Sequence, residues 1–253
     1  MKPARRAELY AAFDGPPGRN VAFLARVAAR HGLPSALSVL DVGCGPGRML
    51  RPLHGLGWKV TGIEPDPGYA AHAAASVADI PVEVRTGGLG DICDRERFDM
   101  IAVVNDPLQY LLAPAERLDA VGRCLEALTR GGRLVLELAN FPWILANLRP
   151  PPVAETDLDG VRVVRRPAHE IDFHSAVWTH RDRFELTWPD GRQEVVEEEH
   201  RLAILTRPEL VSMLQRAGFE AIETWPNTRA AEPGRADGPR LVLTARRGGL
   251  DDR

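Results

Sequence analysis

The fold is decided by residues 38–50, which read Ser38-Val39-Leu40-Asp41-Val42-Gly43-Cys44-Gly45-Pro46-Gly47-Arg48-Met49-Leu50. A short apolar run that gives way to alternating glycines and then to a helix-compatible segment is typical of a buried parallel strand turning into a helix. Glycine allows positive φ and lets a ligand approach the main chain closely. The N–H groups that start the following helix, expected over 47–56, suit a carboxylate or phosphate. The stretch therefore predicts a ligand site.

A second strand-like run, residues 59–64, ends in a single carboxylate. It reads Lys59-Val60-Thr61-Gly62-Ile63-Glu64, and Glu64 follows Asp41 by 64 − 41 = 23 positions. An acid at the tip of the second strand, about twenty residues after the first strand, is where a nucleotide ribose offers its hydroxyl groups. The two strand tips together indicate a site for an adenosine-containing ligand.

These segments resemble the class I S-adenosylmethionine-dependent methyltransferases. The resemblance is carried by Asp41-Val42-Gly43-Cys44-Gly45-Pro46-Gly47 and Gly62-Ile63-Glu64-Pro65-Asp66, and it extends over roughly residues 33–145. A dinucleotide fingerprint would need its last small residue at position 48, where Arg48 stands, so a pyrophosphate-containing cofactor is disfavoured. The resemblance implies S-adenosylmethionine as cofactor, bound by Asp41, Gly43, Cys44, Gly45, Gly47, Glu64, Pro65, Gly88, Leu89 and Asn105.

The loop after the third expected strand departs from the family pattern. It reads Thr86-Gly87-Gly88-Leu89-Gly90-Asp91-Ile92. The family usually has a Gly-Asp pair here, but Gly88 occupies the expected acidic position and Asp91 stands three residues later. Leu89 is the expected apolar contact of the adenine ring. Which of Gly88 and Asp91 lies beside the adenine amine stays open.

Length and composition describe an ordinary folded protein. The chain has 253 residues, 44% hydrophobic and 26% charged, which predicts one domain with an embellishment. A net charge of −3 gives no basic field that would attract nucleic acid. The sequence has neither an apolar run of about eighteen residues nor a signal-peptide pattern, so we expect a cytoplasmic protein without a membrane span. The three cysteines fit neither a disulfide framework nor a zinc site, and we expect no metal.

Strand-like and helix-like segments alternate from residue 37 onward, which predicts an α/β fold. We expect a Rossmann-like, doubly wound, mostly parallel seven-stranded sheet with one reversed strand. Right-handed crossovers bring the carboxyl ends of the parallel strands to one edge, where we expect the active site. The expected strands are 38–42, 59–64, 82–85, 98–105, 132–138, 219–225 and 240–245, and the expected helices include 47–56, 67–77, 114–129 and 206–217.

The chain is expected to have three regions. Residues 1–32 form an N-terminal helical cap, and residues 33–148 with 206–247 form the cofactor-binding domain. Residues 149–205 break the α/β rhythm and are expected to form an antiparallel β insertion that serves as a lid or as the surface of a homodimer. Within it the alternating segments are 161–165, 170–173, 176–187 and 192–205.

The fourth strand leads into Asn105-Asp106-Pro107-Leu108-Gln109-Tyr110. Polar groups directly after a buried strand are costly unless they bind something, so we predict a functional segment; the alternative is that Asp106 and Pro107 merely start a turn. The candidate catalytic residues are Asp106, Tyr110 and His200, and the candidate substrate-binding residues are Tyr10 and Gln109. Tyr10 packs against the core in the alternative interpretation, and Arg19 is a candidate for the cofactor carboxylate.

We expect an enzyme that transfers a methyl group to nitrogen or oxygen of a small-molecule acceptor. The donor arrives activated, so the protein needs only to align the reactants, exclude water and, for a hydroxyl acceptor, remove a proton. The alternative is a non-catalytic protein that binds the cofactor or a partner on the same fold, favoured by the missing Gly-Asp pair. The acceptor stays open, because specificity resides in the insertion and the N-terminal helices, where no motif is informative.

Overall fold

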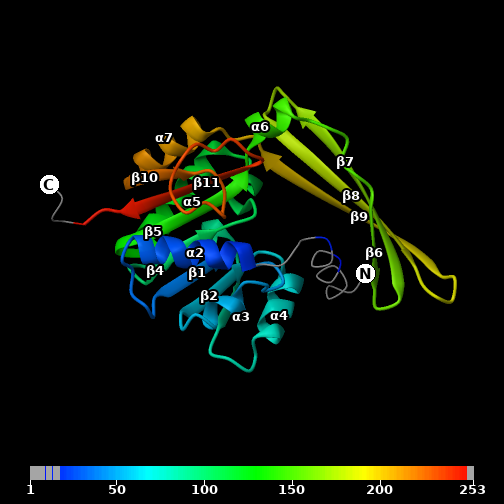
Figure 1. Cartoon of the computed structure of the whole chain (residues 1–253), viewed down its shortest axis with the longest axis horizontal. Coiled ribbons are helices and arrows are strands. Elements are labelled where there is room, and N and C mark those ends of the chain that lie inside the picture. Colours follow the sequence, from blue (N-terminus) through cyan, green and yellow to red (C-terminus); the bar gives the residue numbers. More distant parts are fainter. Residues whose placement is uncertain (1–8, 10–12, 14–17, 250–253) are drawn as a thin grey trace.

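The computed structural model describes Leu9, Phe13 and residues 18–249, and its main element is a seven-stranded sheet, sheet A (Figure 1). The strand order is β10-β11-β5-β4-β1-β2-β3. The strands are β1 (Ser38–Val42), β2 (Lys59–Glu64), β3 (Glu83–Thr86), β4 (Phe98–Val103), β5 (Leu128–Ala139), β10 (Phe219–Trp225) and β11 (Arg240–Arg247). Neighbouring strands are parallel except that β11 is antiparallel to β5 and to β10. The predicted Rossmann-like sheet with one reversed strand is confirmed.

Helices cover both faces of sheet A, because successive residues of a strand point to opposite faces. The α-helices are α2 (Gly18–Arg30), α3 (Leu50–His54), α4 (Pro67–Ser76), α5 (Pro114–Ala127), α6 (Phe141–Ala146) and α7 (Arg207–Ala217). Leu40 and Val42 of β1 belong to the core cluster that contains residues of α5 and α7. Val39 belongs to the cluster on the other face, with residues of α2, α3 and α4. The sheet is therefore doubly wound.

Strand β1 lies at the point where the order of the sheet reverses. It pairs with β2 on one side and with β4 on the other, so Asp41 lies opposite both Gly62 and Ala102. The connections that follow β1 and β4 lead to opposite halves of the sheet, which opens a crevice at the carboxyl ends of these two strands. The loops after β1, β2 and β4 therefore meet at one edge, as the sequence predicts.

The helix after the glycine loop is shorter than expected. The prediction was 47–56, but α3 spans only Leu50–His54 and has no side-chain N-cap. Gly45 and Gly47 have φ values of 57° and 88°, and a right-handed helix requires negative φ. The helix therefore begins three residues later than predicted, and an anion at its N-terminus stays a prediction.

A second sheet, sheet B, is formed by the insertion and lies beside sheet A (Figure 1). Its order is β6-β7-β8-β9, and each neighbouring pair is antiparallel. The strands are β6 (Ala154–Leu158), β7 (Val161–Asp172), β8 (Val177–Thr187) and β9 (Gln193–Ala203). The predicted antiparallel insertion is confirmed, although β6 was not expected and β7 replaces two shorter strands. Pro167 fits in β7 because β6 begins at Ala154, opposite Arg165, so β7 has no partner on that side at residue 167.

Two apolar clusters anchor sheet B. Phe141, at the start of α6, packs on Trp178 of β8 with ring centroids 5.2 Å apart, and Ala139 and Leu202 complete this cluster. Leu9 is 1% exposed and joins the second cluster, whose other buried members are Val161, Val163, Phe184 and Leu186. The inner face of sheet B is therefore held toward the end of β5, next to the crevice of sheet A.

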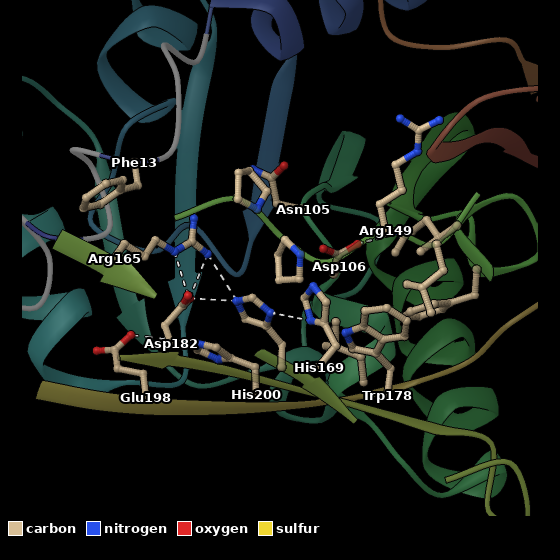
Figure 2. Close-up of a pocket in the computed structure, with 18 of the residues that line it drawn as sticks. Phe13, Asn105, Asp106, Arg149, Arg165, His169, Trp178, Asp182, Glu198 and His200 are labelled. Atoms are coloured by element: carbon tan, nitrogen blue, oxygen red, sulfur yellow. Dashed lines mark hydrogen bonds and ion pairs between the residues drawn. The ribbon is translucent and has the colours of Figure 1, made fainter. Parts of the chain in front are cut away.

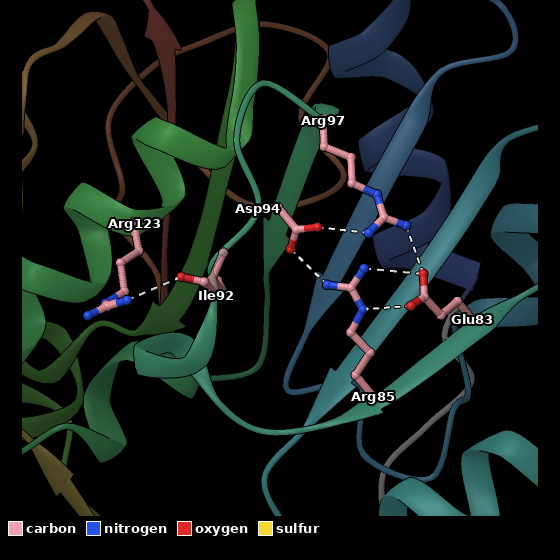
Figure 3. Close-up of polar contacts among 6 residues, drawn as sticks. All are labelled: Glu83, Arg85, Ile92, Asp94, Arg97 and Arg123. Carbon is pink, nitrogen blue, oxygen red and sulfur yellow. Dashed lines mark hydrogen bonds and ion pairs between the residues drawn. The ribbon is translucent and has the colours of Figure 1, made fainter.

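A ring of charges closes the β3 edge of sheet A (Figure 3). Arg85 donates to Glu83 at 2.8 Å and to Asp94 at 2.7 Å, and Arg97 donates to the same two carboxylates at 2.7 and 2.8 Å. Charged groups on an edge strand discourage pairing with another chain. This network lies on β3 and the loop before β4, and we assign it a structural role.

Candidate functional site

A cavity of about 800 Å³, which we call the loop cavity, lies at the carboxyl end of β1. It is lined by the glycine loop, by Asn105 after β4, by residues 226–229, 235 and 237–239 before β11, and by Arg240 at the start of β11. Gly45 has φ of 57°, and a Cβ added there would meet no atom within 4 Å, so the cavity reaches the main chain at this residue. A Cβ at Gly43 would approach Pro107 Cγ to 2.8 Å. The loop therefore combines close packing with an open face for a ligand.

Asp41 is the most unusual group of the loop cavity. It is 1% exposed, and neither carboxylate oxygen has a hydrogen-bond partner among the described residues. Burial, and secondarily the charge of Glu64, raises the pKa of Asp41 to about 7. A buried carboxylate without partners is costly, so it marks a place where a donor or a cation from a ligand is expected.

Glu64 lies at the tip of β2, as predicted, and its carboxylate organises both neighbouring loops. Oε2 accepts from the Gly45 N–H at 2.9 Å, and Oε1 accepts from the Asp66 N–H at 3.0 Å. Burial raises the pKa of Glu64 above its ordinary value. Asp66 in turn caps α4 by accepting from Gly68 N at 2.8 Å and Tyr69 N at 3.0 Å. The acid thus ties the tip of β2 to the glycine loop.

The other predicted cofactor residues lie in two environments. Asp41, Gly43, Cys44, Gly45 and Asn105 line the loop cavity, and so does Arg19. A Cβ at Gly47 would come within 3.0 Å of Ala73, so this glycine allows α4 to pack closely. Leu89 is 4% exposed in the core, Gly88 N donates to Asp91 at 2.8 Å, and Pro65 lies near Gly88. Cofactor contacts of Pro65, Gly88 and Leu89 stay predictions.

A second cavity, of about 560 Å³, lies between sheet A and sheet B and is called the sheet cavity here (Figure 2). Its floor is the inner face of β7, β8 and β9, where alternate residues point to the cavity. These floor residues are Arg165, His169, Trp178, His180, Asp182, Phe184, Glu198, His200 and Leu202. The sheet cavity shares Asn105 and Arg240 with the loop cavity, so the two lie side by side.

Tyr110 and His200, both predicted as catalytic, meet in the sheet cavity. The Tyr110 hydroxyl lies 3.0 Å from His200 Nδ1, and the two rings are nearly perpendicular. The other ring nitrogen, Nε2, lies 3.7 Å from a Glu198 carboxylate oxygen. Although 49% of Tyr110 is exposed, burial around its hydroxyl and the nearby charge of Asp106 raise its pKa. Tyr110 therefore stays a neutral phenol.

Asp106 lines the sheet cavity but is held by strong donors. Arg240 donates to Asp106 Oδ2 at 3.2 Å and also bonds both oxygens of Glu137, while Ala139 N donates to Asp106 Oδ1 at 2.6 Å. Asn105 and Asp106 have φ values of 63° and 75°, which are uncommon for residues other than glycine. The bonds to both oxygens favour a role of Asp106 in holding this strained turn rather than in removing a proton.

The prediction that Gln109 binds substrate is wrong. Its side chain is 0% exposed, its Oε1 accepts from Ala139 N at 3.0 Å and its Nε2 donates to Ala203 O at 3.1 Å. Gln109 instead links η2 (Pro107–Tyr110) to the ends of β5 and β9. Tyr10, the other candidate for substrate contact, lies outside the described residues.

The largest polar network of the sheet cavity was not found from the sequence. Arg165 makes two bonds to Asp182, at 2.7 and 2.8 Å, and Asp182 accepts from His180 at 2.8 Å (Figure 2). His180 lies 2.9 Å from His169, whose ring lies 4.5 Å from Trp178. Among the described residues no group of His, Cys, Asp or Glu is arranged to hold a metal ion. The period of two in each strand could have revealed this face, had the register been known.

The order of sheet A and the glycine loop at its switch point define a Rossmann-like fold. Residues 39–132 match the family model described as a methyltransferase domain. This match includes the glycine loop and Glu64 and covers less than half of the chain. No helix among residues 18–249 is long and apolar enough to cross a membrane.

Three known proteins are similar to all or part of this chain. The chain is 30% identical over 111 residues to the ubiquinone biosynthesis O-methyltransferase of Bradyrhizobium sp. (strain ORS 278), a match covering 43% of this chain and only 42% of that protein. It is 27% identical over 219 residues to the dTDP-4-amino-2,3,4,6-tetradeoxy-D-glucose N,N-dimethyltransferase of Saccharopolyspora spinosa, covering 85% of both. The fold matches an S-adenosylmethionine-dependent methyltransferase from Clostridium acetobutylicum ATCC 824 with a TM-score of 0.81 at 13% identity, covering 97% of this chain and 99% of that one.

Proposed function

We propose that this protein transfers a methyl group from S-adenosylmethionine to an amine or hydroxyl of a small molecule held in the sheet cavity. The observation that carries the proposal is the buried, unpartnered carboxyl of Asp41 beside the open main chain of Gly45. The adjoining sheet cavity, which shares Asn105 with the loop cavity, supplies a separate space for an acceptor.

The residues of the loop cavity fit this cofactor. Asp41 offers a negative charge for the cationic methionine end, and Arg19 offers a positive charge for its carboxylate. Gly45 lets the ligand lie against the backbone, and Glu64 at the next strand tip suits the ribose hydroxyls. S-adenosylmethionine, when bound, supplies a methyl group already activated on a sulfonium. The protein therefore has to orient an acceptor, exclude water and accept a proton.

The sheet cavity suits an acceptor of metabolite size with both apolar and polar parts. Its volume of about 560 Å³ lies in the range of small-molecule sites. Trp178 and Phe184 give apolar surface, while Tyr110 and His200 give hydrogen-bonding groups. The two relatives act on oxygen and on an amino sugar nitrogen, as their names state, and the longer match is to the amino sugar enzyme. We therefore rank amines first and hydroxyls second.

Isothermal titration calorimetry with S-adenosylmethionine tests the cofactor half of the proposal. We expect binding by the wild-type protein and by the surface variant Glu116→Gln, and weaker binding by Asp41→Ala and Glu64→Ala. A folded wild-type protein that binds none of the compound would contradict the proposal.

Incubation with labelled cofactor and a panel of amines, amino sugars, nucleotide-linked amino sugars and phenols tests the acceptor half. Methylation of a panel member supports the proposal, and the methylated atom then decides between nitrogen and oxygen. Tight cofactor binding without turnover across the whole panel would favour the non-catalytic alternative.

A further inference from the structure

Three histidines form a ladder on the inner face of sheet B. His169 of β7 lies directly opposite His180 of β8, and His180 lies directly opposite His200 of β9. Directly opposite residues of antiparallel strands share a face, so all three rings line the sheet cavity. The ring centroids are 4.7 Å apart for His169 and His180 and 6.3 Å apart for His180 and His200. The ladder is therefore continuous across three strands.

The contacts of this ladder indicate where its protons lie. Arg165 donates to both oxygens of Asp182, and the bonds from His180 and Arg165 hold the pKa of Asp182 below its ordinary value although burial opposes this. Arg165 Nη2 lies 3.2 Å from His180 Nε2 but only 2.8 Å from Asp182 Oδ2, so we assign the Arg165 proton to Asp182. An ionised carboxylate only accepts, so His180 Nε2 then carries a proton and donates to Asp182 at 2.8 Å. In neutral His180, Nδ1 then accepts, and its partner at 2.9 Å, His169 Nδ1, must donate.

In this arrangement one lone pair of the three histidine rings has no hydrogen-bond donor in the described structure. With its proton on Nδ1, His169 has an unprotonated Nε2, and no hydrogen bond to this atom is found in the described part of the chain. Burial, with smaller contributions from His180 and Arg165, lowers the pKa of His169 to about 4, so the ring is neutral at pH 7. His200 differs, since Tyr110 lies at its Nδ1 and Glu198 at its Nε2. The lowered pKa makes His169 a weak base, but of these two rings it is the one with a ring nitrogen that has no hydrogen-bond partner among the described residues.

We propose that His169 Nε2 accepts the proton of the acceptor's N–H or O–H group, and that Arg165, Asp182 and His180 position it for this role. The inference rests on the proposed methyltransferase function. The N–H or O–H bond breaks, its electron pair stays on the nitrogen or oxygen that becomes methylated, and the proton passes to His169 Nε2 and from there to solvent, because this weakly basic ring does not keep it. The ionised Asp182, two hydrogen bonds away through His180, balances the new positive charge.

Other charges around the cavity decide how far this proton transfer depends on pH. The titratable and charged groups that line it with His169 are Arg165 on β7, His180 and Asp182 on β8, Glu198 and His200 on β9, Asp106 and Tyr110 beside η2, Arg149 before β6 and Arg240 on β11. Arg165 is paired with Asp182, and Arg240 with Asp106 and Glu137, so these charges largely cancel. The protonation of His169 therefore depends mainly on its neighbours in the ladder, His180, Asp182 and Arg165.

Nitrogen NMR of the whole protein, without cofactor or acceptor, tests the proton positions. A neutral histidine in water carries its proton mainly on Nε2, so an Nδ1–H form of His169 would be diagnostic. With ¹⁵N-labelled histidine at pH 7.5, and assignment by loss of signals in His169→Asn, we expect the Nδ1–H pattern for His169. In Asp182→Asn the amide donates to His180 Nε2, and we expect His169 to change to Nε2–H. An Nε2–H pattern in the wild-type protein would overturn the proposal.

Steady-state kinetics with an acceptor from the panel provide a second test of the proposal. Asn at position 169 keeps a donor near the place of Nδ1 but has no counterpart of Nε2, so we expect kcat to fall about 100-fold with KM changed less than threefold. The matched control is His174→Asn at the exposed β7–β8 turn, which should behave like wild type. Unchanged kcat in His169→Asn would overturn the proposal. A wild-type protein that methylates nothing would instead contradict the proposed function, since the NMR result stands by itself.

Discussion

Gly45 and Glu64 are joined by a hydrogen bond of 2.9 Å, from the glycine N–H to Oε2 of the carboxylate. The bond connects the loop after β1 to the tip of β2, the two features from which the sequence predicts a nucleotide site. Because Glu64 also accepts from Asp66 N, one side chain fixes both loops before any ligand arrives. A binding site shaped in advance loses less conformational entropy when its ligand binds.

Replacing Glu64 by Ala therefore removes more than a ribose contact. We expect the affinity for S-adenosylmethionine to fall by roughly 1 to 3 kcal/mol, because charge-assisted hydrogen bonds are lost and the glycine loop is released. Calorimetric titration measures the change, with Glu116→Ala as a control on the exposed start of α5. Equal affinity in the two variants would show that Glu64 does not serve the cofactor.

Asp41→Asn tests whether the buried carboxyl is kept for ligand binding at the expense of stability. The pKa of Asp41 is raised on folding to about 7, so the folded state binds more protons than the unfolded state between pH 3.8 and 7. Stability from this group is present below that window and is lost as the pH rises through it. We expect the ligand-free variant to melt on the order of 5 °C above wild type at pH 8.

The same comparison at pH 4 supplies the control. There Asp41 is protonated and resembles asparagine in charge, so the two melting temperatures should converge. The variant should also bind S-adenosylmethionine more weakly at pH 8, since its neutral amide cannot balance a cationic group. A wild-type protein that is the more stable of the two at pH 8 would mean that Asp41 has a partner in solution.

Gly62→Ala tests how tightly β2 packs against the glycine loop. A Cβ at this position would lie 2.9 Å from Cys44 Sγ and 3.0 Å from Leu50 Cδ2. Such overpacking costs about 1–3 kcal/mol of unfolding free energy, which chemical denaturation can measure. Gly122→Ala in α5 is the matched control: its Cβ would meet no atom within 4 Å, and we expect a gain of about 0.5–1 kcal/mol.

A second substitution checks the cause of that loss. Cys44→Ala removes the sulfur atom that the new methyl group would approach, so the double variant should recover part of the stability lost in Gly62→Ala. If the Cys44→Ala effect is the same with glycine and with alanine at position 62, the strain lies elsewhere.

The sequence predicts the fold well because its signals are local. Buried parallel strands are short apolar runs, and the tips marked by Asp41 and Glu64 are chemically distinct in the chain itself. The glycine loop misled us about α3, since the left-handed Gly47 that ends the loop also delays the helix. Local patterns thus identify elements more reliably than they identify where elements begin.

The acceptor site is less predictable because it depends on pairing. His169, His180 and His200 are 11 and 20 residues apart, and only the register of β7, β8 and β9 aligns them. The sequence alone drew attention to Tyr110 and His200, which do meet, but not to Asp182. Gln109 was a candidate for substrate binding, yet its side chain is buried and bonds to main-chain groups of β5 and β9.

Tyr110 and His200 are best tested as a pair, since their 3.0 Å contact predicts coupling. Tyr110→Phe and His200→Phe each remove this hydrogen bond while keeping a ring in place. We expect each to lower kcat/KM about tenfold, roughly 1.4 kcal/mol, and the double variant to be no worse than either, because the shared bond is already lost. Affinity for S-adenosylmethionine, measured on the same samples, should not change. A hundredfold loss in the double variant would mean that the two side chains act on the acceptor independently.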